Sequence, residues 1–74
     1  MDQLLADYMV FKTTIKNQLD KLMVMFELNT DEEILDWSVD LQDKDCVLRV
    51  ASNSKTPTQI QYIIKQLGYD CDEL

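Results

Sequence analysis

Side chains able to do covalent or metal chemistry are scarce in this chain of 74 residues, which holds two cysteines and no histidine. Cys46 and Cys71 stand 25 positions apart, which is neither the CxxC spacing of a thiolate pair nor the density of a disulfide framework. A Ser-His-Asp triad cannot exist without histidine, and one glycine cannot build a Gly-rich phosphate loop. The sequence therefore predicts that the protein is not an enzyme.

Cys71 is the cysteine with the more informative neighbours. Asp70, Asp72 and Glu73 surround it, and negative charge nearby raises the pKa of a thiol and weakens it as a nucleophile. Cys46 is expected to be a small residue of the core. Cys71 is retained as a possible metal ligand.

Acidic residues outnumber basic residues by 14 to 7, so the net charge is −7. This field repels phosphate and anionic lipid, and we expect neither nucleic acid nor membrane insertion. The longest apolar run, residues 22–26, is far shorter than the ~20 residues of a membrane span. No secretory signal pattern is present, and a cytoplasmic location is expected.

The cluster of Asp31, Glu32 and Glu33 is typical of a solvated loop and is also a candidate interaction site.

The elements that must position these residues begin after residues 1–7, which carry no sustained period and are interpreted as a lead-in segment. Residues 8–74 then form one domain. Residues 8–15 alternate with a period of two, which predicts a strand. Asn17 is suited to cap a helix, and Asp20 adds negative charge to its first turn.

The apolar residues of this first helix form a wide stripe. Positions i, i+3, i+4 and i+7 are Leu19, Leu22, Met23 and Phe26. The stripe is widened by Val24, Met25 and Leu28. Such a stripe indicates either a deeply packed helix or an exposed contact patch. We expect packing, because apolar residues at helical spacing usually belong to the core.

Two more strands follow, over residues 35–41 and 46–51, and they are predicted to form a β-hairpin. Trp37 is expected on the buried face of the first of them, as a core or sheet-face residue rather than a ligand platform.

A second helix is then well signalled. Thr56, Pro57 and Gln59 provide a capping box with proline at the first helical position. Gly68 suits the C-terminal end of this helix, and residues 69–74 can add a last strand.

The order βαββα, with the possible final strand, is typical of the split βαβ or ferredoxin-like arrangement. We therefore predict an α+β fold in which two helices cover one face of an antiparallel sheet.

With this order of elements, the chain resembles the heavy-metal-associated domains of copper chaperones and metal-transporting ATPases, especially their small stand-alone bacterial members. The likeness runs from about Met9 to Asp72. It rests on Phe11-Lys12-Thr13-Thr14-Ile15-Lys16 as the first strand, on residues 34–41, and on Gly68-Tyr69 after the second helix.

In that family the first strand leads into a Cys-x-x-Cys loop, whose thiolates hold a soft ion such as Cu(I). Asn17 and Asp20 stand at those positions here, and neither is a soft donor. The resemblance thus implies the fold without the family's copper site. Tyr69 stands where bacterial members place a tyrosine close to the metal loop, and it is a candidate interaction residue.

The resembled fold also predicts where the cysteines lie. Cys46 is expected at the hairpin end of the sheet, whereas Cys71 is expected at the other end, nearer to Asn17 and Asp20. A disulfide between the cysteines is not expected, because it requires a Cα separation of roughly 4.4 to 6.8 Å.

Three functions are compatible with these residues. We expect a degenerate heavy-metal-associated domain that acts as a small protein-interaction or regulatory module without a cofactor. Its partner is expected to be a protein with a basic surface. The alternative is a Cu(I) or Zn(II) carrier that uses Cys71 with nearby ligands or a second subunit. A further alternative is an acidic mimic of nucleic acid, which scattered carboxylates would count against. The oligomeric state is left open.

Overall fold

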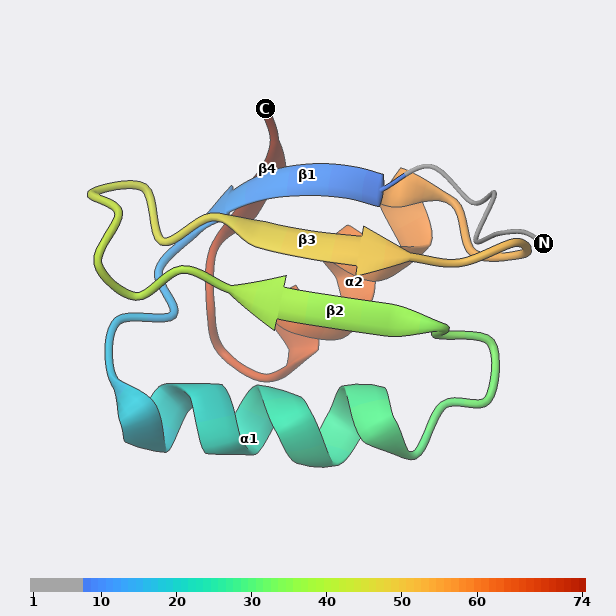
Figure 1. Ribbon diagram of the computed structural model, residues 1–74, viewed down its shortest axis with the longest axis horizontal. Helices are drawn as coiled ribbons and strands as arrows, with labels where there is room; N and C mark the ends of the chain where they lie inside the picture. Colours follow the sequence, from blue (N-terminus) through green and yellow to red (C-terminus); the bar gives the residue numbers. More distant parts are fainter. Residues whose placement is uncertain (1–7) are drawn as a thin grey trace, which may run out of the picture.

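The computed structural model describes residues 8–74, which form four strands and two helices (Figure 1). The elements in chain order are β1 (Tyr8–Thr13), α1 (Gln18–Asn29), β2 (Asp36–Val39), β3 (Leu48–Ala51), α2 (Pro57–Gln66) and β4 (Cys71–Glu73). The lead-in segment 1–7 lies outside the described residues.

The four strands form one antiparallel sheet in the order β2-β3-β1-β4. β1 is one of the two inner strands, because Phe11 lies opposite Leu48 of β3 on one side and Glu73 of β4 on the other. This confirms the predicted α+β, ferredoxin-like fold, including its final strand. No helix among residues 8–74 is long and apolar enough to cross a membrane.

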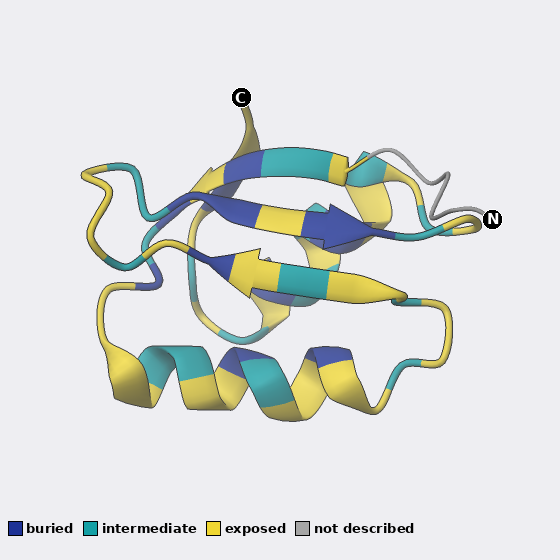
Figure 2. Ribbon diagram, viewed as in Figure 1, coloured by how far each residue is buried: buried dark blue, intermediate teal, exposed yellow. Residues whose placement is uncertain are grey.

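The core lies between the sheet and the two helices (Figure 2). Phe11, Thr13 and Ile15 are buried, as the period of two predicts, whereas Lys12 is exposed. Strands and helices contribute together to a single cluster, which consists of Phe11, Ile15, Val24, Leu28, Val39, Leu48, Val50, Ile60, Ile64 and Cys71.

The predicted helix ends are confirmed. The Asn17 side chain accepts the Asp20 N–H at the start of α1. At the start of α2, the Thr56 hydroxyl accepts the Gln59 N–H while the Gln59 side chain accepts the Thr56 N–H, so both halves of the capping box are present. Gly68 follows α2 with φ 101°, a left-handed conformation that glycine adopts without a Cβ penalty.

The predicted packing face of α1 is wrong. The buried residues of this helix are Val24 and Leu28. The four residues of the expected face are exposed, with exposed fractions of 71%, 42%, 49% and 63% for Leu19, Leu22, Met23 and Phe26.

A two-layer fold buries only one side of a helix, and here the buried side is the i, i+4, i+8 ridge of Asp20, Val24 and Leu28. The Asp20 carboxylate at the start of this ridge accepts the hydroxyl of Tyr69. That contact joins the start of the ridge to the connection between α2 and β4.

The hairpin strands are shorter than the alternation predicts. β3 begins at Leu48 rather than at residue 46, because Cys46 has φ 45° and therefore belongs to the turn. At the other end of the hairpin, Leu35 precedes β2 and is 49% exposed, although the alternation predicts it on the buried face.

Candidate functional site at the loop end of the sheet

Three connections meet where β1 ends (Figure 1). The Thr13 N–H donates to the Asp45 carbonyl at 3.0 Å, and the Thr13 hydroxyl donates to the Cys46 carbonyl at 2.7 Å. On the other side, the Asp70 N–H donates to the Thr14 hydroxyl at 2.9 Å. We call residues 14–20, 40–47 and 67–70 the loop end.

Asn17, Asp20 and Tyr69 are joined by hydrogen bonds at the loop end. The Asn17 Oδ1 atom accepts the Asp20 N–H at 2.9 Å. The two carboxylate oxygens of Asp20 accept the Lys16 N–H at 3.1 Å and the Tyr69 hydroxyl at 3.0 Å. Burial, followed by the hydrogen bond to Asp20, raises the pKa of the Tyr69 hydroxyl. The interpretation of Asn17 as a helix cap is confirmed, and its Oδ1 atom is used in that bond.

The loop end is rich in aspartate. Asp20 starts α1, and Asp70 precedes β4. The hairpin adds Asp40 and Asp43, whose carboxylates accept the N–H groups of Gln42 and Asp45. The sequence alone did not reveal this cluster, because its members come from three separate segments. Only the topology, which returns each connection to the end of β1, brings them together.

The candidate residues Asp31, Glu32 and Glu33 lie at the opposite end of α1. Twelve helical residues, about 18 Å at the standard rise, separate this end from Asn17. Lys55 lies 3.2 Å from the Asp31 carboxylate and 3.4 Å from that of Glu33. The Glu33 N–H and Lys55 both lower the pKa of Asp31. The structure therefore does not bring these acids together with Tyr69.

The predicted separation of the cysteines is wrong. Because β3 runs antiparallel to β1, the turn before β3 lies beside the end of β1, and the Cys46 carbonyl accepts the hydroxyl of Thr13. Cys71 lies opposite Thr13 on the other side. Both cysteines are thus at the same end of the sheet, with Cys46 in the loop end and Cys71 directly after it. Both are free thiols, and β1 lies between them. Cys46 is half-buried in its turn and does not belong to the core cluster, contrary to expectation.

Cys71 is a core residue with no exposed surface. Burial, followed by the charge of Asp72, raises the pKa of its thiol to about 11, although Lys65 acts in the opposite direction. Within residues 8–74, no group of three or more His, Cys, Asp or Glu side chains is arranged to hold a metal ion. Of the three acids predicted to raise this pKa, Asp72 has that effect, and burial is the larger cause.

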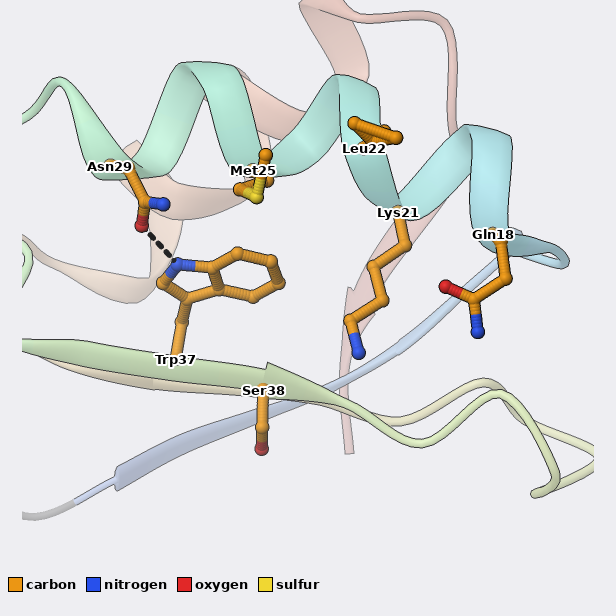
Figure 3. Close-up of a pocket in the computed structure, with 7 residues that line it drawn as sticks. All are labelled: Gln18, Lys21, Leu22, Met25, Asn29, Trp37 and Ser38. Carbon is orange, nitrogen blue, oxygen red and sulfur yellow. Dashed lines mark hydrogen bonds between the residues drawn. The ribbon is translucent and has the colours of Figure 1, made fainter.

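A second feature is a cleft of about 350 Å³ between α1 and β2 (Figure 3). Half-buried Trp37 forms one end, where its indole N–H donates to the Asn29 side-chain oxygen at 2.8 Å. Lys21 extends from α1 into the other end. The lining residues are Gln18, Lys21, Leu22, Met25, Asn29, Trp37 and Ser38. Trp37 packs against the core, as expected, and also lines this opening.

Solved structures that share this fold include two that contain Ccc2a. One is the solution structure of the Atx1-Cu(I)-Ccc2a complex, with a TM-score of 0.77, 17% identity, and coverage of 90% of this chain and 93% of that chain. The other is the yeast copper transporter domain Ccc2a in its apo and Cu(I)-loaded states, with a TM-score of 0.76 and the same identity and coverage. No protein-family model and no curated protein matches the sequence. The chain therefore has the fold of these copper-transport domains.

Proposed function

We propose that this domain is a protein-binding module that has the fold of copper-transport domains without their thiolate site, and that its loop end binds a partner with a basic surface. The observation that carries the proposal is the gathering of five aspartates at one end of the molecule, which are Asp20, Asp40, Asp43, Asp45 and Asp70. They outnumber the two lysines of the loop end, Lys16 and Lys44, of which Lys44 lies 3.5 Å from the Asp45 carboxylate. The charge of −7 over the whole chain extends this field. Complementary charge favours encounter with a cationic surface and loses strength as salt rises.

The comparison with known structures supports binding to another protein. One structural neighbour is the Atx1-Cu(I)-Ccc2a complex, in which two proteins are joined with Cu(I). A protein of this fold thus assembles with another protein. The loop end of the present chain offers charge and hydrogen-bonding groups for such an assembly.

The chemistry of the loop end supports a role other than copper transfer. Asn17 and Asp20 present oxygen atoms that are hydrogen bonded within the protein, and Cu(I) prefers soft sulfur ligands. Cys71 offers sulfur, but its buried thiol keeps its proton up to about pH 11. To bind this sulfur, a metal ion must therefore replace the thiol proton, and the side chains packed around Cys71 must move apart.

We expect the reduced protein to form no tight stoichiometric complex with Cu(I) or Zn(II) when a chelator competes, because neither the cap nor the buried thiol supplies a ready ligand. Native mass spectrometry of the titrated chain measures this. A complex with one ion per chain, or one per two chains, that is lost in Cys71→Ser would instead establish the metal carrier.

The partner surface is tested with two variants of equal charge. Asp45→Asn with Asp70→Asn removes two charges at the loop end, and Glu32→Gln with Glu33→Gln removes two at the opposite end. We expect the first pair to reduce capture of cross-linked partner proteins roughly fivefold to tenfold at low salt, and the second to change it little. Quantitative mass spectrometry of the captured proteins gives the ratio. Equal losses, or a loss only with the second pair, would refute docking at the loop end.

The acids also bear on the nucleic-acid mimic. Acids among residues 8–74 lie on connections at both ends of the molecule, near Asp43 and near Glu32, and others lie within α1, β2 and β4. A mimic of the phosphate backbone needs charges in a regular row. This distribution therefore favours the protein-binding module.

A further inference from the structure

Four apolar side chains of α1 are exposed. We call Leu19, Leu22, Met23 and Phe26 the outer face of α1, and Leu22 also lines the cleft between α1 and β2. Exposed residues are yellow in Figure 2. A large side chain exposes roughly 200 Å² when free, so the exposed fractions amount to roughly 450 Å² of apolar surface. The largest apolar patch of a typical monomer has roughly 300–600 Å² and is often functional.

We propose that the outer face of α1 binds the same face of a second copy, with the two helices antiparallel. An interface with twofold symmetry needs a surface that is complementary to itself. Positions 19, 22, 23 and 26 are symmetric about their midpoint. A twofold axis at that midpoint therefore sets Leu19 beside Phe26 of the other copy, and Leu22 beside Met23.

The charges at the two ends of α1 fit the antiparallel orientation. Exposed Lys16 precedes the N-terminal end, which also carries the positive end of the helix dipole. Exposed Glu27 lies near the C-terminal end. An antiparallel pair places Lys16 of each copy near Glu27 of the other, whereas a parallel pair would bring the two Glu27 carboxylates together.

The area predicts a reversible dimer. Two outer faces bury roughly 900 Å² of apolar surface, which is below the ~1,200 Å² of stable specific interfaces and within the range of weak, transient ones. The outer face shares Leu19 with the loop end, but it includes neither Asp45 nor Asp70, the residues that test the proposed function. The two proposals are therefore tested at different residues.

Sedimentation equilibrium over a range of concentrations tests the proposal. We expect the mass to rise with concentration from 8.7 kDa toward twice that value. Phe26→Ser should weaken association at least tenfold. Tyr62→Ser is the matched control, because Tyr62 on α2 is 64% exposed and Phe26 is 63% exposed; it should leave association unchanged. Circular dichroism of both variants verifies that they fold.

The orientation is tested by charge exchange. Lys16→Glu alone and Glu27→Lys alone should each weaken the dimer severalfold at low salt, because each places like charges together. The double variant should recover the association of the original chain. If the double variant is weaker than both single variants, the antiparallel pairing is wrong.

The dependence on salt distinguishes association through the outer face of α1 from binding at the loop end. Two copies with a charge of −7 repel each other, so higher salt should strengthen the dimer. Higher salt should instead weaken the binding of a basic partner at the loop end. A chain that stays monomeric at every concentration and salt level overturns the proposal. So does a dimer that Phe26→Ser does not weaken, or one that Tyr62→Ser weakens equally. None of these three results affects the partner-capture test with the Asp45 and Asp70 variants.

Discussion

Replacing Thr13 with valine is expected to lower the free energy of unfolding by about 2–4 kcal/mol, because valine keeps the shape of threonine but has no hydroxyl. Thr13 is 6% exposed. Its Oγ1 atom donates to the Cys46 carbonyl and accepts the Ile15 N–H at 3.1 Å. The substitution leaves both backbone groups without this partner at the point where the hairpin and the loop before α1 meet.

Urea denaturation of the original chain and Thr13→Val, followed by circular dichroism, measures the difference. Thr13→Ser is the control, since serine keeps the hydroxyl and loses only a methyl group; it should remain more stable than the valine variant. If valine proves as stable as serine, the hydrogen bonds of this hydroxyl do not hold the loop end together.

The second large effect concerns the buried thiol of Cys71 at high pH. The pKa of this thiol is raised from 9.0 to about 11 in the folded chain. Below pH 9 the thiol is protonated in both states, and the stabilising contribution is complete. Above pH 9 the unfolded chain releases the proton first, so stability should fall by about 1.4 kcal/mol per pH unit up to about pH 11. The total loss attributed to this thiol is roughly 2–3 kcal/mol.

Cys71→Ala isolates this contribution, because every other group that titrates in the same range is present in both proteins. The difference in unfolding free energy between the two chains, measured by denaturation at several pH values from 8 to about 11, should shrink as pH rises. A parallel measurement of thiol alkylation near pH 8 should modify half-buried Cys46 well before Cys71. A difference that is constant with pH would contradict the raised pKa.

The sequence allowed prediction of the elements whose signals are local. Period-two alternation gave the buried positions Phe11, Thr13 and Ile15, and the side-chain chemistry at Asn17 and Thr56 gave the helix starts. These signals depend on a few neighbouring residues, so a single chain contains all the information they need. The order of the elements then sufficed for the ferredoxin-like fold.

Features that depend on tertiary contacts could not be predicted in this way. The apolar residues of α1 cover most of its circumference, so periodicity did not distinguish the side with Val24 and Leu28 from the side with Phe26. The contact between Tyr69 and Asp20 contributes to which side of α1 is buried, and these residues are 49 positions apart. The acidic loop end was missed for a related reason. Asp45 and Asp70 become neighbours of β1 only through strand direction and order.

The lengths of the outermost strands bear on how the chain avoids aggregation. β2 has four residues and β4 has three, and both lie at the edges of the sheet. β4 presents exposed Asp72 and Glu73, and short, charged edges are poor templates for further strands. Addition of chains edge to edge into a continuous sheet is therefore disfavoured. The pairing proposed through α1 is a contact of a different kind, because a twofold pair uses the same surface of both chains and leaves no free copy of it for a third.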